Sequence, residues 1–415
     1  MKILLYGINY SPELTGIGKY SGEFARWCAE QGHEIRVVTA PPYYPEWNVH
    51  EEYSAVKYQR NVENGVSVTR CPLYVPAQPS AIKRMLHLMS FSLTSSFALF
   101  SNFRWKPDLV IQVAPTLFCS VATLIFSKLS GAQSVLHIQD YEVDAMFGLS
   151  MAGGGTFKKM AYGLERAVLR RFERVSTISQ GMIERAVDKC VDPSRLILFP
   201  NWSEIERFQN ISINGEYRVS LGVSPEKKLV LYSGSMGEKQ GLESVLDAAF
   251  RLKDREDIQF LLVGEGGAKE MLVRECESKQ LENVLFAPIQ PYDSLPDLLA
   301  IADCHLVVQK RGAADSVLPS KLTNILAVGG NAVITADRET TLGELTQDWP
   351  GIACCVEPES ISALVAGIEE VLSMPSPNSV ALDYAQKHLD KNVILNKFMA
   401  NFRERVESCE KPDDR

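Results

Sequence analysis

The chain has 415 residues, which exceeds the size of one ordinary hydrophobic core and predicts two domains. Apolar residues make up 46% of it and charged residues 23%, the composition of a soluble globular enzyme. The net charge of −8 argues against nucleic acid as a partner, because proteins bind nucleic acid largely by neutralising its phosphates.

In the first half of the chain, short apolar segments alternate with segments of helical period. We expect strands over residues 2–9, 34–39, 109–113, 134–138 and 174–178, and helices over 19–31, 119–130 and 157–171. Strands that are apolar throughout and alternate with helices predict a parallel sheet covered on both faces.

A run without charged residues extends over residues 85–103, between Arg84 and Arg104. Its length is close to that of a membrane span, but a histidine, an asparagine and several Ser and Thr residues argue against one. Two interpretations stay open. The run forms a buried helix of the first domain, or an interfacial helix whose basic flanks, including Lys83 and Lys106, meet lipid head groups. The two are compatible if one face packs and the other meets lipid.

The second half of the chain repeats the plan of the first. We expect strands over residues 229–233, 259–263, 304–308, 332–335 and 352–356, and helices over 243–252, 321–327 and 360–372. Between Pro200 and Leu229 the sequence has several Asn and Gly residues and few apolar runs, which is typical of a boundary. The predicted domains are therefore 1–205 and 206–390, with a helix and charged tail over 391–415 that could pack back on the first domain.

The cysteines and histidines carry no metal or disulfide signal. Nine cysteines are scattered without a Cys-x-x-Cys pair, which favours reduced thiols in a cytoplasmic protein. The six histidines show no spacing typical of metal ligands on one helix. We therefore expect no metal cofactor.

Two loops of the first domain are candidates for ligand binding, because open α/β sheets bind ligands beyond the carboxyl ends of their strands. Residues 9–18 contain Gly16 and Gly18, which would let the backbone approach a ligand, although an ordinary turn explains them equally well. Asp140 follows the strand 134–138 and could take a proton from a hydroxyl group. A helix N-cap is the alternative role for Asp140, and spacing alone favours it.

Two glycine-rich loops follow strands of the second domain. Residues 233–241 include Gly234, Ser235 and Lys239, the composition of a phosphate-binding loop, but they lack the Gly-Lys-Ser/Thr ending of a P-loop. Gly264 and Glu265 follow the next strand in a second glycine-rich turn. That turn is a weak signal alone and gains weight beside the first loop.

A third loop of the second domain precedes a short helix. Ser320 could cap a helix that begins near Lys321, and the positive helix start with Lys321 and Arg311 could hold a diphosphate. Asn324 lies about one turn into this helix, within reach of a ribose or sugar hydroxyl. An ordinary capped helix with a solvated basic start is the alternative.

Together these loops resemble the family-four retaining glycosyltransferases of the GT-B fold, over nearly the whole chain. The matching motifs are Gly-His-Glu at 32–34, Pro-Asn at 200–201, Val-Gly-Glu-Gly at 263–266, Ala-Ile-Ala-Asp at 300–303, Pro-Ser-Lys-Leu at 319–322 and Leu-Ala-Val-Gly at 326–329, in family order and spacing. The resemblance implies an α/β protein with two Rossmann-like domains whose parallel sheets face an interdomain cleft. It also implies a nucleotide-sugar site in the second domain and an acceptor site in the first.

The chain departs from the family pattern at residues around the helix expected over 321–327. Most of the family has two glutamates at a fixed spacing, the second binding ribose. Here Asn324 occupies the second position and Ser316 the first, with Asp315 beside it. The resemblance therefore assigns donor binding to Asp315 and Asn324, and to Leu322 within the Pro-Ser-Lys-Leu motif.

Further departures concern the family's cations and its catalytic-region histidine. Where most of the family has Gly-Arg, this chain has Gly234-Ser235. Where most of the family has Lys-Gly, it has Gln240-Gly241, with Lys239 one residue earlier. The resemblance therefore implies that Lys239 and Lys321 bind the donor phosphates. The histidine position holds Gln139, with His137 two residues before it. His137 and Asp140 are thus the catalytic candidates, and their roles stay open.

The sequences of residues 137–140 and 319–330 are similar to those of fucosyltransferases of colanic-acid biosynthesis. This implies transfer of L-fucose from GDP-fucose to a polyprenyl-diphosphate-linked sugar in exopolysaccharide repeat-unit assembly, at the inner face of the cell membrane. A basic cluster on the helix expected over 157–171 would suit an anionic bilayer, unless it is only a solvated face. The alternatives are a sugar-nucleotide epimerase or hydrolase, and a binding subunit without catalysis, because Asn324 replaces a carboxylate.

Overall fold

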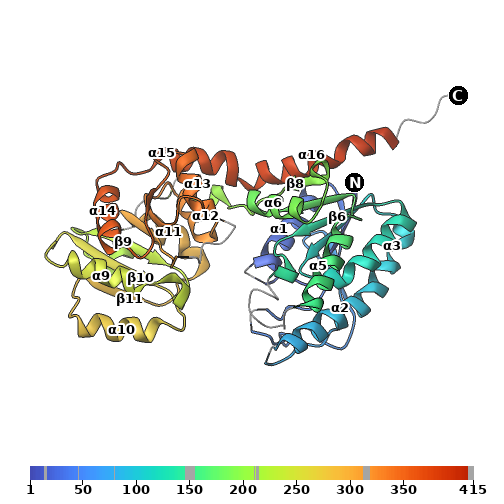
Figure 1. The fold of residues 1–415 in the computed structure, drawn as a ribbon, viewed down its shortest axis with the longest axis horizontal. Helices are drawn as coiled ribbons and strands as arrows, with labels where there is room; N and C mark the ends of the chain where they lie inside the picture. Colours follow the sequence, from blue (N-terminus) through green and yellow to red (C-terminus); the bar gives the residue numbers. More distant parts are fainter. Residues whose placement is uncertain are drawn as a thin grey trace. The chain divides into compact units, whose positions relative to one another are not determined.

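A computed structural model of the chain describes residues 1–13, 16–44, 46–78, 80–144, 155–209, 211, 215–311 and 318–409 (Figure 1). The chain divides into two compact units, unit 1 with Met1–Pro200 and Lys397–Arg415, and unit 2 with Asn201–Asn396. The division follows Pro200, whereas the sequence analysis placed the boundary after residue 205.

Unit 1 is built on an eight-stranded sheet with the order β3-β4-β2-β1-β5-β6-β7-β8. Its strands are β1 (Lys2–Tyr6), β2 (Glu34–Thr39), β3 (Gln59–Glu63), β4 (Val66–Arg70), β5 (Leu109–Ala114), β6 (Gln133–Ile138), β7 (Arg174–Thr177) and β8 (Leu196–Leu198). All neighbours pair in parallel except β3, which is antiparallel to β4. The predicted parallel sheet is therefore confirmed, and at this edge it gains an antiparallel strand through the hairpin formed by the short loop at Asn64 and Gly65.

The helices of unit 1 are α1 (Gly16–Glu30), α2 (Ala81–Ser101), α3 (Ser120–Ser130), α5 (Thr156–Leu169) and α6 (Gln180–Asp188), with short 3₁₀ turns η1 (Phe103–Trp105), η2 (Leu117–Cys119) and η3 (Pro193–Arg195). The hydroxyl of Ser80 caps α2 and that of Ser179 caps α6. The helix α3 ends where Gly131 takes a left-handed conformation at φ 79°. Local capping chemistry thus sets these boundaries.

The helix α2 contains most of the uncharged run, and it has two different faces. Phe91 and Leu99 are completely buried in the core of unit 1, whereas Leu93 and Phe97 are 68% and 69% exposed. Within the described residues, no helix has both the length and the apolarity needed to cross a bilayer. One face of α2 therefore packs in the core, as the buried-helix interpretation requires. The exposed face is compatible with the interfacial-helix interpretation.

Unit 2 has a six-stranded, fully parallel sheet with the order β11-β10-β9-β12-β13-β14. Its strands are β9 (Lys228–Ser233), β10 (Ile258–Val263), β11 (Val284–Ala287), β12 (Cys304–Val307), β13 (Ala332–Thr335) and β14 (Cys354–Val356). Alternate residues of β9 enter different hydrophobic clusters, with Leu231 in one and Val230 in the other. The sheet is therefore covered on both faces, as predicted.

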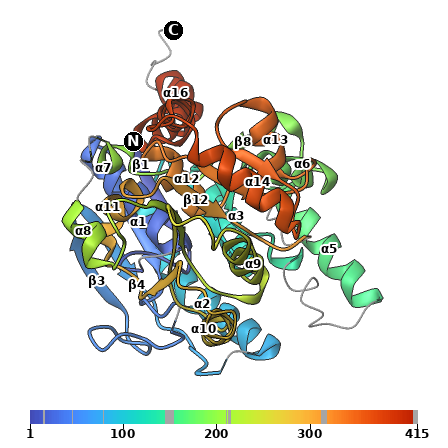
Figure 2. The same ribbon diagram turned by 90° about the vertical axis from the view of Figure 1, so that its left-hand side faces the viewer.

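The helices of unit 2 cover this sheet (Figure 2). They are α7 (Ile205–Phe208), α8 (Gly215–Ser220), η4 (Glu238–Gln240), α9 (Glu243–Arg251), α10 (Lys269–Ser278), η5 (Tyr292–Ser294), α11 (Leu295–Ala300), α12 (Ser320–Ala327), α13 (Thr341–Asp348), α14 (Ile361–Leu372), α15 (Ser379–Tyr384) and the π-helical turn η6 (Ala385–Leu389). The following helix, α16 (Lys391–Cys409), enters unit 1 from Lys397 onward. There Phe398 stacks on Phe199 with ring centroids 3.8 Å apart, which fixes α16 to unit 1.

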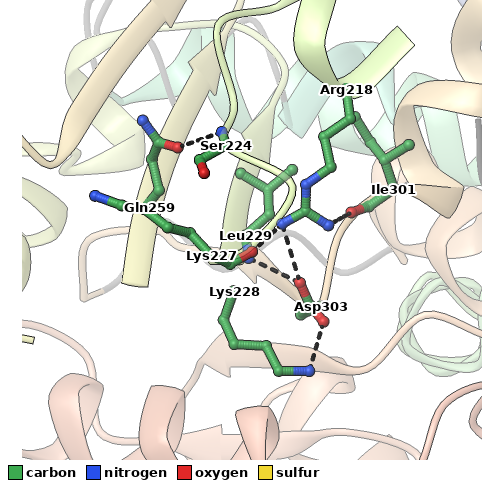
Figure 3. A network of polar contacts seen from close by, with 8 residues as sticks. All are labelled: Arg218, Ser224, Lys227, Lys228, Leu229, Gln259, Ile301 and Asp303. Carbon is green, nitrogen blue, oxygen red and sulfur yellow. Dashed lines mark hydrogen bonds and ion pairs between the residues drawn. The ribbon is translucent and has the colours of Figure 1, made fainter. Parts of the chain in front are cut away.

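Asp303, the last residue of the Ala-Ile-Ala-Asp motif, organises the amino end of β9 (Figure 3). Its carboxylate accepts hydrogen bonds from the backbone N–H of Leu229 at 2.8 Å and from Nζ of Lys228 at 2.9 Å. Arg218 approaches the same carboxylate at 3.6 Å and donates to the carbonyl of Ile301 at 3.4 Å. Because strand carboxyl ends form the opposite edge of the sheet, this motif supports the fold and lies away from the predicted ligand loops.

Candidate functional site

The strand order of unit 2 places its candidate loops at one edge of the sheet. The chain winds outward from β9 in both directions, so β9 and β12 flank the point where the order reverses. In open parallel sheets, ligands bind beyond the strand ends at such a point. The loops after β9, β10 and β12 all leave from that edge, because the strands are parallel.

The glycine loops after β9 and β10 pack backbone against backbone. The N–H of Met236 donates to the carbonyl of Glu265 at 2.9 Å, and the N–H of Ala268 donates to the carbonyl of Met236 at 2.9 Å. A Cβ atom at Gly264 would lie 1.9 Å from the carbonyl oxygen of Gly234. A Cβ atom at Gly266 would lie 2.4 Å from that of Met236. Glycine is therefore required here to bring the two loops together.

Lys321 lies against the first of these loops. Its Nζ donates to the hydroxyl of Tyr232 at 3.1 Å and sits 4.2 Å from the centroid of the Tyr232 ring. A Cβ atom at Gly234 would be only 3.1 Å from the same Nζ. Burial lowers the pKa of Lys321 to about 8, and among the described residues no carboxylate forms an ion pair with it. The site therefore holds a cation whose charge is not compensated within the described residues.

Tyr232 is a site residue that the sequence analysis missed. Its hydroxyl donates to the carbonyl of Ser235 at 2.5 Å and accepts from Lys321, so it links the glycine loop to α12. The side chain of Tyr232 is completely buried in the core of unit 2. A phenol directly after the aliphatic run Leu229–Leu231 was the available signal, since a buried hydroxyl needs a partner.

The start of α12 differs slightly from the prediction. The helix begins at Ser320 itself, with Pro319 at the cap position, so the prediction of Ser320 as the N-cap was wrong by one residue. Proline suits that place because it has no N–H to leave unpaired. Leu322 is completely buried in the core of unit 2, so its side chain packs and does not face the site.

Two further cations of the predicted site have different surroundings. Arg311 forms ion pairs with Asp337 at 2.9 Å and with Glu357 at 2.7 Å, so its charge is already compensated. Lys239 is exposed on η4, and its carbonyl accepts the N–H of Lys310 at 2.9 Å, which ties the loops after β9 and β12 together. Lys239 thus stays at the edge of the site, whereas two carboxylates already neutralise Arg311.

The remaining predicted donor residues are also accounted for. The carboxylate of Glu265 accepts a hydrogen bond from Nζ of Lys269 at 2.6 Å. The two side chains form an ion pair at the start of α10. The side-chain oxygen of Asn324 accepts the hydroxyl of Ser203 at 3.0 Å, so this amide is engaged with the segment that enters unit 2. Ser235 is exposed. Asp315 lies outside the described residues.

In unit 1, the structure places the two catalytic candidates in different environments. His137 is buried on β6, with Nδ1 3.0 Å from the hydroxyl of Ser176 and Nε2 3.1 Å from the amide nitrogen of Gln139. Burial lowers the pKa of His137 to about 3, so the ring is neutral and both nitrogens are occupied. Asp140 is exposed just past the end of β6. The structure therefore does not support proton transfer by His137, and it keeps Asp140 accessible.

The loop that contains Gly16 and Gly18 holds a buried carboxylate. Glu13 accepts hydrogen bonds from the backbone N–H groups of Tyr43 and Tyr44, each at 3.2 Å, and from the Asn9 amide at 2.9 Å. A Cβ atom at Gly18 would lie 2.6 Å from Oε2 of Glu13, whereas Gly16 is needed for its φ of 57°. Burial raises the pKa of Glu13. This loop is thus held together by a glutamate that the sequence analysis did not single out.

A metal site in a protein requires several ligand side chains close together. Over the part of the chain that the structure describes, no three His, Cys, Asp or Glu side chains come together in a way that could hold an ion. The expectation that no metal is needed stays a prediction.

Known proteins share this fold. Sucrose-phosphate synthase from Thermosynechococcus elongatus superposes with a TM-score of 0.70 at 14% identity, over 98% of this chain and 100% of that chain. HepE from Anabaena in complex with UDP gives a TM-score of 0.67 at 15% identity, with the same coverage of 98% and 100%. At these identities the likeness shows the fold alone, which is GT-B.

Sequence relationships identify the family. Residues 15–202 match the family described as "Glycosyl transferase 4-like domain", and residues 214–388 match "Glycosyl transferases group 1". The chain is 57% identical over 408 residues to an Escherichia coli (strain K12) protein named "Putative colanic acid biosynthesis glycosyl transferase WcaI", a match that covers 97% of this chain and 100% of that protein. The chain therefore belongs to this family of GT-B glycosyltransferases.

Proposed function

We propose that this glycosyltransferase moves L-fucose from GDP-fucose to a polyprenyl-diphosphate-linked sugar during colanic-acid repeat-unit assembly, with retention of anomeric configuration. The observation that carries the pathway assignment is the 57% identity, over the full length of that protein, to the relative named for colanic acid biosynthesis. HepE, which shares the fold, binds UDP, and this supports a nucleotide-diphosphate donor here. The reaction would take place in the cytoplasm, at the inner face of the cell membrane.

The proposed donor site lies in unit 2, where the geometry suits a diphosphate. During transfer the bond from the anomeric carbon to the donor phosphate breaks, and negative charge grows on the departing nucleotide diphosphate. Lys321 and the first N–H groups of α12 would stabilise that charge, because an ammonium and a helix start both favour anions. The glycine loops would allow the phosphates to come close to the backbone.

The acceptor hydroxyl must lose a proton as its oxygen bonds to the anomeric carbon. We propose Asp140 for this step, because it is exposed at the carboxyl edge of the unit 1 sheet where ligands of such sheets bind. His137 is excluded from the proposal, since its nitrogens are occupied and its pKa of about 3 keeps it neutral. Asp315 and Asn324 remain proposed donor contacts.

A donor panel tests the proposal. The protein is incubated with GDP-fucose, GDP-mannose, UDP-glucose and ADP-glucose, with and without a polyprenyl-diphosphate-linked sugar, and released nucleotide diphosphate is measured. We expect GDP release only from GDP-fucose with acceptor present, and a product whose anomeric configuration, read by NMR, matches the donor. Free fucose without acceptor would indicate a hydrolase. Tight donor binding without release would indicate a binding subunit, and silence with every donor and acceptor would overturn the proposal.

The role of Lys321 has its own test. Replacing Lys321 with Ala should lower kcat/KM about a hundredfold, because it leaves phosphate charge uncompensated in the transition state. Lys279→Ala is the matched control, since Lys279 forms ion pairs with Asp247 and Glu275 at the far end of α10 from the glycine loops. Equal activity of the Lys321 variant and the control variant would remove Lys321 from the site.

A further inference from the structure

The outer face of α2 exposes a continuous row of large apolar side chains. Seven residues on this face are between 36% and 70% exposed: Ile82, Met85, Leu86, Met89, Leu93, Phe97 and Phe100. They recur at intervals of three and four residues, which places them on one side of the helix. The opposite side carries the buried Phe91 and Leu99, so the core of unit 1 does not need the exposed row.

A second apolar row lies on the neighbouring helix. On η2 and α3, Phe118, Val121, Ile125 and Leu129 are between 42% and 62% exposed, again at intervals of three and four. The two helices lie side by side (Figure 1, Figure 2) and are joined by a hydrogen bond of 2.9 Å from Ser92 to the carbonyl of Phe118. We call the two rows together the α2–α3 face.

The segments that form the α2–α3 face carry mainly basic charges. Residues 81–139 contain one acidic residue, Asp108, against five lysines and arginines, although the whole chain has a net charge of −8. The basic residues of these segments stand at the ends of the helices: Lys83, Arg84, Arg104, Lys106 and Lys128. An apolar surface on helices whose own charges are all basic is complementary to an anionic lipid surface.

The charges also favour a bilayer over a second protein as the partner of this surface. A second copy of this chain would bring identical basic margins against each other, and such like-charge contacts are unfavourable. Apolar patches larger than a few hundred Å² on a monomer mark interaction sites, and protein interfaces usually add a rim of mixed polarity. The helices of the α2–α3 face themselves carry no acidic side chain, and the carboxylates that contact Leu117 and Trp105, Glu142 and Glu34, come from other segments.

The direction of α2 relates this face to the ligand-binding edge of unit 1. Near the carboxyl ends of the strands, Ser95 lies 2.7 Å from the hydroxyl of Tyr6, and Thr94 donates to the carbonyl of Pro72 at 2.6 Å. At the other edge, Arg36 donates to Asn102 at 3.0 Å. The first three turns of α2 therefore extend beyond the carboxyl edge and carry Lys83 and Arg84 there.

We propose that the α2–α3 face lies on an anionic bilayer, with its apolar rows in the acyl–headgroup boundary and its basic margins on lipid phosphates. This orientation holds the carboxyl edge of the unit 1 sheet at the membrane surface. It deepens the proposed function, on which it rests for the lipid-linked acceptor: the acceptor would be met at that surface without leaving the bilayer. The docking itself depends only on the α2–α3 face.

Vesicle sedimentation tests the docking. The full-length protein is mixed with vesicles of phosphatidylcholine, with and without phosphatidylglycerol, and the bound fraction is measured at low and high salt. The first variant, Leu93→Asp with Phe97→Asp, should lower partitioning onto anionic vesicles at least about a hundredfold, because it places charge in the apolar boundary. The matched control is Val56→Asp with Val62→Asp, which changes residues 79% and 76% exposed elsewhere in unit 1 and should bind as the wild type does.

A second variant keeps the test informative if the first fails to fold. Lys83→Gln with Arg84→Gln should weaken binding to anionic vesicles about 25-fold, since each basic residue near such a surface contributes about a factor of five. High salt should reduce this difference. Equal binding by the wild type and by both variants, or no binding of the wild type to anionic vesicles, would overturn the proposal. A dimer in solution that the Leu93 and Phe97 substitutions dissolve would also overturn it.

A turnover assay distinguishes failure of the docking proposal from failure of the proposed function. With GDP-fucose and a short-chain, water-soluble acceptor, both variants should keep wild-type rates within about twofold, while with acceptor embedded in anionic vesicles they should slow in proportion to their lost binding. Docking without turnover on either acceptor would reject the proposed reaction and leave the membrane face standing.

Discussion

The two units share a winding pattern but use their strand ends differently. In unit 2, Lys321 faces a glycine loop without a carboxylate partner among the described residues. In unit 1, most polar groups at the same edge are used by the fold: His137 bonds to Ser176 and Gln139, and Glu142 accepts the N–H of Leu117 at 3.0 Å. The difference teaches that a polar residue at a strand end is a site candidate only when the fold leaves it accessible.

The largest effect should come from the loop packing in unit 2. Gly264→Ala places a Cβ atom 1.9 Å from the carbonyl oxygen of Gly234, at a φ of 154°, so the two loops must separate. We expect GDP binding to fall more than about a hundredfold and unit 2 to lose about 3 kcal/mol of stability. Calorimetric titration and thermal unfolding measure both. Gly267→Ala is the control, because its Cβ atom would meet nothing within 4 Å; similar behaviour of the two variants would show that the loops are not a rigid cradle.

The next effect concerns the accessible acid of unit 1. Asp140→Asn should lower kcat about a hundredfold, because an amide cannot accept the acceptor proton. Its exposed position predicts a change in unfolding free energy within about 0.5 kcal/mol. Asp188→Asn, at another exposed acid of unit 1, should leave kcat unchanged. If kcat of the Asp140 variant stays at the wild-type value, the base must be sought elsewhere, for example on the departing phosphate.

A smaller, graded effect should follow pH. Since burial holds the pKa of Lys321 at about 8 in the ligand-free protein, the ammonium is mostly present at pH 7 and is lost as pH rises above 8. The Kd for GDP should therefore rise towards tenfold per pH unit above that value. Lys321→Arg stays charged and should flatten the profile. A wild-type Kd that is constant from pH 7 to 9.5 would contradict the assignment.

The smallest effect on activity is predicted for His137. His137→Gln should cost about 1–3 kcal/mol of stability, because it disturbs the buried bonds to Ser176 and Gln139. It should leave kcat within about threefold of wild type, since the ring lies away from the surface. The sign of its pH effect is fixed: the folded-state pKa of about 3 lies below that of the unfolded chain, so its stabilising contribution is full above pH 6.5 and declines as pH falls. A large loss of kcat at unchanged stability would restore a catalytic role.

The elements that the sequence predicted well are the buried ones. The strands expected over 34–39 and 332–335 are confirmed with the same bounds, because their apolar runs are continuous and end abruptly. The β3–β4 hairpin was missed. Gln59–Glu63 reads as polar, and because this edge strand has no fully buried residue it shows no alternation that would reveal it.

The candidate site was predictable in its loops but not in its contacts. Glycine after a strand marked both loops of unit 2, yet the contact of Lys321 with Tyr232 joins residues 89 positions apart, which no local pattern reveals. The sequence offers Arg311 as a diphosphate-binding cation but does not reveal its ion pairs, because Asp337 and Glu357 follow strands later in the chain. The resemblance names His137 because it lies two residues before the family's histidine position at Gln139, whereas in the fold His137 is buried against Ser176 and Gln139.

One titration tests the central claim, that unit 2 holds the donor diphosphate through Lys321 and the glycine loops. GDP and guanosine are titrated separately into the wild type, Lys321→Met and the control Lys279→Met at pH 7. The account predicts that Lys321→Met weakens GDP binding at least about tenfold, leaves guanosine binding unchanged, and that the control matches the wild type. Equal GDP affinity in the wild type and Lys321→Met would contradict it.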